Sequence, residues 1–442
     1  MRTIFFLLFV VIATLSVSRA QEPPSPVPSA AQVAAESTPA INDADPAAAT
    51  RAWLDTVPAD KRARSDAYFE GGYWLILWNF LVGAAIALLF LTTRVSAKLR
   101  DFAERTTRVR ALQVVLYALP YMTIAAALHF PLHAYQHYFR EHAYGLATQS
   151  FAAWFREQLI GAAIELIITP ILLIILYAIF RRMQRTWWIL GTLLAVCFLV
   201  LGMMLAPVYI EPLFNSYKPL KDPAIAEPIL AMARANQIPV TQVYEVDASR
   251  QSNRVSANVA GFLGTTRIAL NDNLLKQCTL PEIREVMAHE MGHYILNHGA
   301  KLVLYFGLFI LIAFAVARLS FDGAVRRWGE RWGVRGIADL AGLPLLSLIF
   351  AIVFFILTPF TNSVTRICER EADAFAINCS REPDGAANVA LKLGTYRKLN
   401  PTPLEEFIFF DHPSGRARIR MAMDWKAAHL PCGGSAPAAA AQ

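Results

Sequence analysis

Six long apolar stretches, separated by polar segments, set the pattern of this chain. Each is long enough to cross a hydrocarbon core of about 30 Å as a helix, and we expect the shortest, the fifth, to continue a helix that begins outside the lipid. The stretches are Tyr73–Thr92, Leu112–Leu132, Gln158–Phe180, Trp187–Ile210, Leu302–Ala317 and Leu340–Thr365. The pattern predicts a mainly α-helical, polytopic membrane protein with four transmembrane helices in residues 72–210 and two more at 302–317 and 340–365.

The segments at the two ends of the chain differ from these stretches. Residues 1–20 combine a basic residue, an apolar run and a small-residue end, which is typical of a cleavable signal peptide. The alternative is an uncleaved first transmembrane helix. Residues 21–71 are rich in Ala and Pro and predict a disordered linker, and residues 426–442 predict a disordered tail.

One substantial polar region lies between the fourth and fifth stretches. Residues 225–235 have helical spacing, 242–246 predict a short strand, and 255–262 with 267–270 predict a hairpin. Residues 281–299 predict a helix with Pro281 in its first turn. After the sixth stretch the helix should continue through 366–378, and 385–420 should be helical with one break at 411–413.

Composition narrows the class of protein. Hydrophobic residues make up 55% of the 442 residues and charged residues only 17%, whereas charged residues are usually about a quarter. These values exclude a soluble globular protein and a disordered chain. The net charge of +7 is explained by membrane topology, so we expect no nucleic-acid partner. No internal repeat is visible, which disfavours a transporter.

The sequence His289-Glu290-Met291-Gly292-His293 fits the pattern HExxH on a predicted helix. Residues four apart share a helix face, so both imidazoles can reach one Zn²⁺ ion. Glu290 then lies at the flank, where its carboxylate can take a proton from a water molecule. The pattern predicts a zinc-dependent hydrolase; the alternative is a pair of surface histidines on a solvated helix.

A third zinc ligand must come from elsewhere, because catalytic zinc usually has three protein ligands. Glu369 and Asp373 are four residues apart on the helix after the sixth stretch and should face the same way, while Glu371 points roughly to the opposite side. We therefore predict that Glu369 binds the metal and that Asp373 orients a ligating imidazole from behind. A solvated cluster of charges is the alternative.

Several motifs together resemble the CAAX prenyl protease type 1 family, the membrane-integral zinc metallopeptidases that include the a-factor-converting enzymes. HEMGH matches that family's HExxH, and NSVTRICEREAD at 362–373 matches its N-x-x-S-R-x-x-E-x-x-A-D pattern, with Thr365 in place of Ser. Further matches are 211–214, 258–272 and Asp411-His412-Pro413 with Arg418. The resemblance covers roughly residues 72–423.

The resemblance implies a role for individual residues. One zinc ion per chain would be held by the metal ligands His289, His293 and Glu369, with Glu290 as general base and acid. Asn258 falls on the edge strand that pairs with an extended substrate, although Val259 replaces the family's usual aromatic residue. His412 and Arg418 fall on positions that approach the reacting carbonyl, where donors stabilise an oxyanion.

The family fold is a ring of transmembrane helices around a large chamber, with a gluzincin-like α+β catalytic region that we assign to residues 211–425. The implied function is a membrane-embedded zinc metalloendopeptidase, of the kind that processes CAAX-box proteins, acting on membrane-delivered polypeptides. Its partners are an extended peptide substrate and the lipid bilayer. Two alternatives are a quality-control metalloprotease of the heat-shock type, disfavoured by four spans before HExxH, and a catalytically relict scaffold, disfavoured by the complete set of site residues.

Basic residues predict the orientation. The first, third and fifth loops between the spans carry fourteen Lys and Arg residues, whereas the second carries two. Short loops rich in basic residues stay in the cytoplasm. We therefore expect a bacterial inner-membrane protein whose zinc site faces the periplasm.

Overall fold

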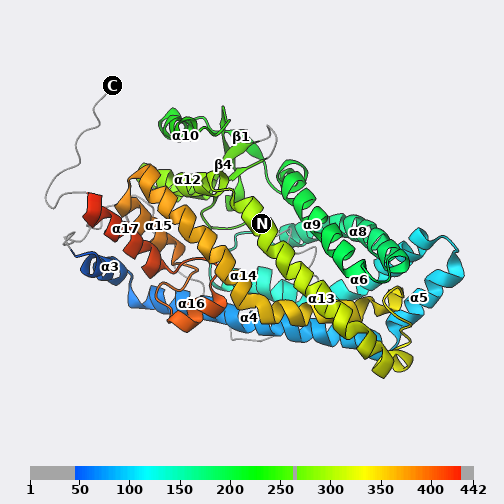
Figure 1. Cartoon of the computed structure of the whole chain (residues 1–442). Coiled ribbons are helices and arrows are strands. Elements are labelled where there is room, and N and C mark those ends of the chain that lie inside the picture. Colours follow the sequence, from blue (N-terminus) through cyan, green and yellow to red (C-terminus); the bar gives the residue numbers. More distant parts are fainter. Residues whose placement is uncertain (1–44, 262–265, 430–442) are drawn as a thin grey trace. The chain divides into compact units, whose positions relative to one another are not determined.

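The computed structural model describes residues 45–261 and 266–429 (Figure 1). The predicted signal peptide, residues 21–44 of the predicted linker and most of the predicted tail lie outside them. The described chain divides into two compact units. We call residues 73–214 and 301–358 the membrane unit, and residues 45–72, 215–261, 266–300 and 359–429 the HExxH unit.

Six helices in the described residues are long and apolar enough to cross a membrane. They are α4 (Ala59–Thr92), α6 (Arg110–Ala134) continued by η1 (Tyr135–Phe139) and α7 (Arg140–Ala143), α8 (Phe151–Arg182), α9 (Trp187–Leu205) continued by η2 (Ala206–Ile210) and η3 (Glu211–Leu213), α13 (His298–Trp332), and α14 (Leu343–Ser380) preceded by η5 (Leu340–Gly342). Each contains one predicted stretch, so the prediction of a polytopic helical protein is confirmed. The fifth stretch is part of a 35-residue helix that begins before it.

Apolar side chains cover much of the outer surface of the membrane unit. Leu193 on α9 and Leu304 on α13 are more than half exposed, and so is Ile356 on α14. Exposed side chains of this kind are unfavourable in water but suit contact with lipid tails. The membrane unit therefore uses its apolar residues on the outside as well as in its core.

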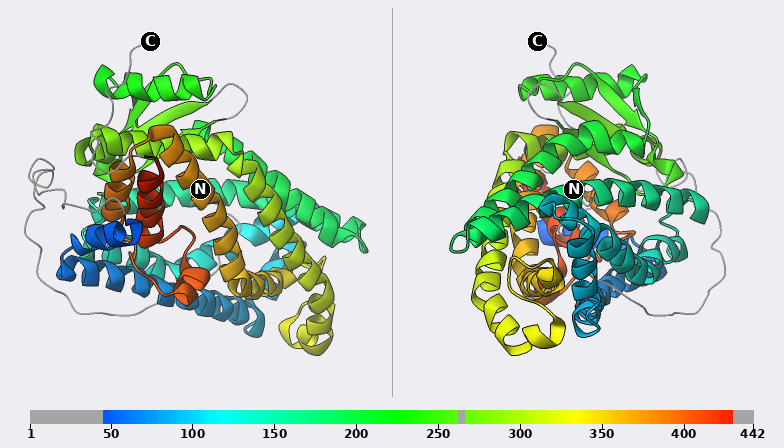
Figure 2. Two further views of the ribbon diagram at one scale, coloured as in Figure 1. Left: turned by 60° about the vertical axis from the view of Figure 1, so that its left-hand side comes forward. Right: turned by 90° about the vertical axis from the view of Figure 1, so that its right-hand side faces the viewer.

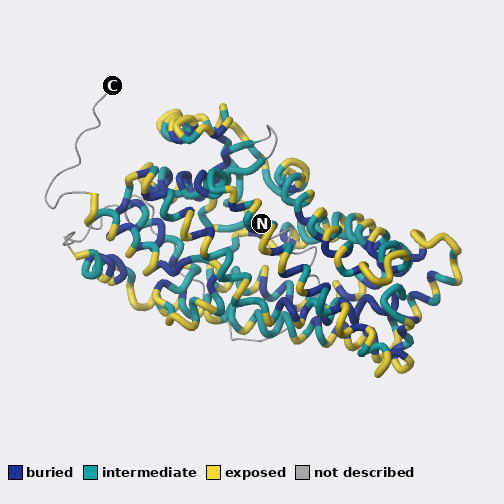
Figure 3. The backbone as a smooth tube through the Cα atoms, viewed as in Figure 1, coloured by how far each residue is buried: buried dark blue, intermediate teal, exposed yellow. Residues whose placement is uncertain are grey.

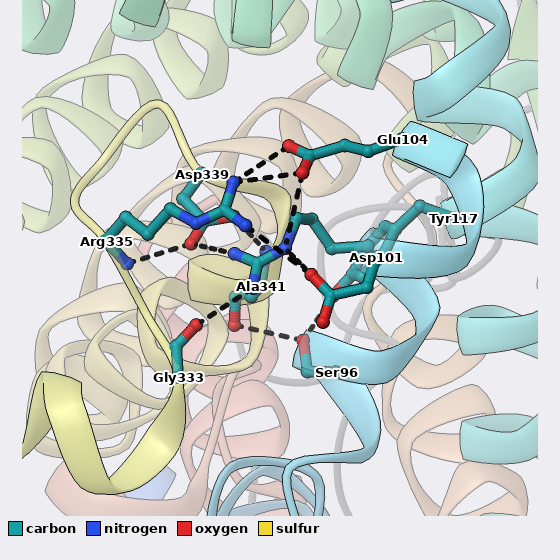
Figure 4. A network of polar contacts seen from close by, with 9 residues as sticks. Ser96, Asp101, Glu104, Tyr117, Gly333, Arg335, Asp339 and Ala341 are labelled. Carbon is teal, nitrogen blue, oxygen red and sulfur yellow. Dashed lines mark hydrogen bonds and ion pairs between the residues drawn. The ribbon is translucent and has the colours of Figure 1, made fainter. Parts of the chain in front are cut away.

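A polar network joins two loops of the membrane unit (Figure 4). The first loop contains α5 (Val95–Thr106), and the other connects α13 to α14. The buried guanidinium of Arg100 donates to Asp339 at 2.5 Å and to Asp101 at 2.7 Å. Arg335 donates to both carboxylate oxygens of Glu104 at 3.0 Å. Because Arg100 and Asp339 are both buried and paired, the two loops are fixed side by side.

The HExxH unit contains a four-stranded sheet in the order β1-β2-β4-β3. The strands are β1 (Tyr217–Pro219), β2 (Val243–Val246), β3 (Ala257–Ala260) and β4 (Arg267–Asn271). β2 and β4 are parallel, and the other two pairs are antiparallel. The antiparallel pairing of β3 with β4 agrees with the predicted hairpin, and it places β3 at the edge of the described sheet.

Two helices share the core of this sheet. They are α10 (Pro223–Ala235) and α12 (Leu280–Ile295), which carries the HExxH sequence (Figure 2). Ile229 of α10 and Met287 of α12 pack in one cluster with Ile268 and Leu270 of β4. Seven of the sixteen residues of α12 are buried and only Leu280 and Pro281 are exposed, whereas α10 has exposed residues along its length (Figure 3). The HExxH helix is thus a core element, and its orientation is set by packing.

The prediction of a disordered linker through residue 71 is wrong for its described part. Residues Pro46–Asp55 form α3, and α4 begins at Ala59. Asp45 caps α3 by accepting from Ala47 N and Ala48 N, and Trp53 and Leu54 are buried against the C-terminal helices. The composition misled because Ala and an initial Pro are also favourable at the start of a helix.

The C-terminal part of the HExxH unit has one break more than predicted. Three helices follow α14, namely α15 (Pro383–Leu393), α16 (Pro403–Phe409) and α17 (Gly415–His429). The break at 410–414 includes the predicted one, and a second break spans 394–402. In the second break Leu399 packs into the core beside Ile419 and accepts a hydrogen bond from Arg416 N at 2.9 Å. This contact holds the loop against the start of α17.

Candidate metal centre

Helix α12 starts at a strong capping sequence. Thr279 N donates to the carboxylate of Glu282 at 2.6 Å, and Pro281 occupies the first turn. Lys392 of α15 donates to the same carboxylate at 2.7 Å. The cap and the ion pair fix the beginning of the helix, so the histidines two to three turns later have a defined direction.

Gly292 explains how a ligand from α14 reaches α12. A Cβ atom at this position would lie 3.3 Å from Ala372 Cα and 3.1 Å from a ring atom of Phe375. A side chain here would require the neighbouring atoms of α14 to move by a few tenths of an ångström, so glycine favours this close approach of the two helices. The middle of HEMGH therefore supplies the contact that brings Glu369 beside the two histidines.

His289, His293 and Glu369 offer three ligand atoms within 4.8 Å of one another. The two Nε2 atoms are 3.0 Å apart. Glu369 places one carboxylate oxygen 3.3 Å from His289 Nε2 and the other 3.5 Å from His293 Nε2. Two imidazoles and one carboxylate form a donor set that suits zinc. The geometry thus fits the predicted ligand set.

Negative charge dominates the surroundings of His289. Burial by itself lowers the pKa of this imidazole, but its hydrogen bonds with Asp373 and Glu369 raise the pKa to about 10. Burial and the nearby His289 instead lower the pKa of His293 to about 4. A site whose carboxylates attract a proton this strongly also attracts a metal cation.

Asp373 and Arg418 lie directly behind the ligands. Asp373 Oδ1 is 2.9 Å from His289 Nδ1, so it accepts the Nδ1 proton and leaves Nε2 for a metal. Arg418 contacts Glu369 at 3.3 Å and Asp373 at 3.1 Å. The structure thus brings both residues to the site, with Arg418 bound to the two carboxylates.

Glu290 is a partly buried carboxyl that directly follows His289 on α12. Burial raises its pKa from the usual value near 4.5 to about 7, while the nearby His289 partly offsets that rise. A group whose pKa lies near neutral can both accept and return a proton. Glu290 therefore has the protonation behaviour that acid–base chemistry requires.

His412 reaches the site from the break between α16 and α17. Its Nε2 is 3.4 Å from Glu369, and Asp411 contacts its Nδ1 at 2.8 Å. Two residues of the N-x-x-S-R pattern hold this segment. Asn362 donates to Ile408 O at 2.8 Å, and Arg366 donates to the carbonyl oxygens of Glu406 and Phe410. The sequence predicted no role for Asn362 or Arg366. Their place in the matching motif was the only signal that they are functionally important.

Asn258 is the one predicted site residue that does not contact this cluster. It lies on β3, which packs beside α12. Its Oδ1 atom is buried and has no hydrogen-bond partner among the described residues. A buried amide oxygen without a partner is costly, so this position suits a donor from another molecule.

Comparisons with known proteins agree with this geometry. Residues 219–426 match the model of peptidase family M48, and residues 46–216 match the model described as CAAX prenyl protease N-terminal, five membrane helices. The uncharacterized metalloprotease YhfN of Bacillus subtilis is 31% identical over 78% of this chain and 82% of its own length. CAAX prenyl protease 1 of Saccharomyces cerevisiae is 25% identical over 67% of this chain and 69% of its own.

A solved structure shares the fold. The crystal structure of Ste24p from S. mikatae matches with a TM-score of 0.69 at 20% identity, covering 83% of this chain and 90% of that one. From the family models and the YhfN relative together, the chain belongs to peptidase family M48 and is a multi-pass membrane metalloprotease related to CAAX prenyl protease 1.

Proposed function

We propose that the protein is a zinc-dependent endopeptidase that hydrolyses peptide bonds of membrane-delivered polypeptides. The observation that carries this proposal is the convergence of His289, His293 and Glu369 within 4.8 Å, with the partly buried carboxyl of Glu290 on the same helix as the two histidines. His289, His293 and Glu369 would hold the ion. Zinc bound there supplies Lewis acidity toward the scissile carbonyl and the attacking water.

The protein's own groups handle the protons. Glu290 takes a proton from the attacking water at a carboxylate oxygen and passes it to the leaving amine nitrogen, for which a pKa of about 7 is suitable. His412, whose Nδ1 atom contacts Asp411, would donate from Nε2 to the developing oxyanion when both of its ring nitrogens carry protons. Arg418 is bound to Glu369 and Asp373, so we assign it the role of holding these two carboxylates in position rather than that of an oxyanion donor.

The edge strand β3 is the proposed docking site for an extended peptide. Within the described sheet β3 pairs with β4 on one side only, so the other side of its backbone can pair with a substrate strand. The buried amide oxygen of Asn258 would accept from that peptide. Backbone pairing tolerates many side chains, so we expect broad specificity. A peptide library would contradict this docking mode if cleavage strictly required one side chain far from the scissile bond and if Asn258→Ala did not change that requirement.

The experiment for the proposed function separates a peptidase from a scaffold. Purified protein in detergent should cleave a generic fluorogenic peptide, lose this activity when a chelator removes the metal, and regain it when zinc is added back. Cleavage that is unaffected by the chelator would contradict the proposal. Absence of cleavage in zinc-loaded, folded protein would favour a scaffold instead.

We also propose that the site faces the periplasm of a bacterial inner membrane. The fourteen basic residues of the first, third and fifth loops are Arg94, Lys98, Arg100, Arg105, Arg108, Arg110, Arg181, Arg182, Arg185, Arg318, Arg326, Arg327, Arg331 and Arg335, against Arg140 and Arg156 in the second. The contact of Arg100 with Asp339 supports a shared side for the first and fifth loops. Two spans separate α12 from Glu369, so both lie on the opposite side from those loops.

A further inference from the structure

His293 has a polar partner on the side away from the metal ligands. Its Nδ1 atom is 2.9 Å from Nδ1 of His298, and Nε2 of His298 is 3.0 Å from a carboxylate oxygen of Glu371. His298 is 1% exposed, whereas the side chain of Glu371 is 43% exposed. A chain of contacts therefore runs from a half-exposed carboxylate through a buried imidazole to a proposed zinc ligand.

The hydrogen atoms in this chain can be placed by elimination. The carboxylate of Glu371 only accepts, so Nε2 of His298 must donate. In a neutral His298 the Nδ1 atom then carries no proton and accepts, so Nδ1 of His293 is the donor. Nε2 of His293 is left with its lone pair, directed toward His289 and Glu369. This is the tautomer that a metal ligand needs.

The other histidine ligand, His289, is held in the metal-binding tautomer by a carboxylate directly. Asp373 accepts directly from Nδ1 of His289 at 2.9 Å. Glu371 cannot do this for His293, because it is two residues from Asp373 and projects from another side of α14. His298 fills that distance, so the two ligands are oriented by carboxylates of a single helix.

The turn after α12 places His298 where it is needed. Asn297 has φ of +52°, a left-handed conformation that Asn adopts more readily than most residues. Its amide donates to Tyr294 O at 3.2 Å, so α12 ends and α13 begins within a single turn. The chain reverses tightly enough to bring His298 back onto His293.

We propose that His298 and Glu371 form a relay that fixes His293 in its metal-binding tautomer, an inference that rests on the proposed zinc site. His298 and Glu371 are positioning residues in this account, since neither touches the ion or the substrate. Their contribution should appear in the affinity for zinc itself. Partners of this kind typically contribute a factor of about 10 to 100 to metal affinity.

The test measures the zinc dissociation constant of the full-length protein by competition with a chromophoric chelator. We expect His298→Ala to weaken binding about 10- to 100-fold and Glu371→Ala about 10-fold. Glu371→Gln should stay closer to the unmodified protein, because its amide oxygen still accepts from His298. His298→Gln should lie between the alanine variant and the unmodified protein for the same reason. Arg370→Ala, on the exposed neighbour of Glu371, is the matched control.

Cobalt substitution gives a second readout that does not depend on activity. The visible absorption of bound Co²⁺ reports ligand geometry, so His298→Ala and Glu371→Ala should change the spectrum and Arg370→Ala should not. His293→Ala distinguishes the two levels of the account. One outcome would reject only the relay: His293→Ala loses zinc, whereas folded His298→Ala and Glu371→Ala bind zinc with unchanged affinity. The peptidase assignment would then stand. If His293→Ala also keeps zinc with unchanged affinity, both are wrong.

Discussion

Glu285 is a buried carboxyl one helical turn before His289. Ser380 donates a hydrogen bond to its Oε2 atom. Burial raises its pKa from the usual value near 4.5 to about 7. The folded protein therefore keeps a proton on Glu285 in a pH range where the unfolded chain has lost it.

This shift predicts a pH-dependent effect of Glu285→Gln. Between about pH 4.5 and 7 the folded state binds more protons than the unfolded state, so the free energy of unfolding falls as pH rises. Glutamine removes the ionisation and keeps a neutral polar group.

We expect the variant to be more stable above pH 7, by up to about 3 kcal/mol, and equal to the unmodified protein near pH 4, as measured by thermal unfolding in detergent. Glu227→Gln, an exposed control, should show no such trend, and an equal gain for Glu285→Gln at both pH values would contradict the explanation.

Residue-level prediction succeeded where chemistry depends on helix periodicity. The spacing of His289 and His293, and of Glu369 and Asp373, placed each pair on one helix face, and the structure brings all four together. Periodicity also placed Glu371 on another side of its helix. It could not reveal His298 as the group on that side, because this contact depends on the reversal of the chain at Asn297.

Arg366 connects α14 to the end of α16 within the HExxH unit. We predict that its loss impairs catalysis without loss of the metal. It lies on α14 and donates to carbonyl oxygens at the end of α16, next to His412. Arg366→Ala should free this segment and lower peptide cleavage by about 10-fold or more, since catalysis is sensitive to displacements of about 1 Å. Zinc content should stay near that of the unmodified protein, because none of the three ligands lies on α16 or in the segment after it.

The control for this prediction is Arg370→Ala, which removes an exposed charge one turn further along α14. Its cleavage rate should be unchanged. Full activity in Arg366→Ala would show that the hydrogen bonds from Arg366 to the segment before His412 are dispensable. Loss of zinc would show that Arg366 instead supports the metal ligands.

Elements were predictable to different degrees. The edge hairpin and the HExxH helix follow from alternating apolar residues and from capping at Thr279, both of which act locally. Helix α3 was missed because its evidence is tertiary. The short Ala-rich run at residues 46–52 favours a helix but is too short to hold one by itself. The helix is stabilised by Trp53 and Leu54 in a core formed with residues such as Ile419, more than 350 positions later.

The topology of the whole molecule predicts the behaviour of reporter fusions. In the proposed orientation the basic loops are cytoplasmic, which would put the C-terminus in the periplasm. An alkaline phosphatase fused at Gly433 should be active, and green fluorescent protein fused there should be dark. The reverse pattern would place the metal site in the cytoplasm and contradict the proposed orientation.

At this scale the spans were predictable because lipid imposes a length and a polarity on every crossing helix. All six predicted stretches lie within helices that meet both criteria. The pairing of Arg100 with Asp339 was not predictable, because the residues are more than 200 positions apart and nothing in their local sequence indicates a partner.

The central claim is that Glu290 performs the proton transfers of a zinc peptidase whose ligands are His289, His293 and Glu369. The most direct measurement compares zinc content and peptide cleavage in purified Glu290→Gln and His293→Ala proteins. Glu290→Gln should keep about one zinc ion per chain and lose cleavage by at least about 100-fold, because the ligands remain and the base is gone. His293→Ala should lose both zinc and cleavage. A Glu290→Gln protein that cleaves at the rate of the unmodified enzyme would contradict the account.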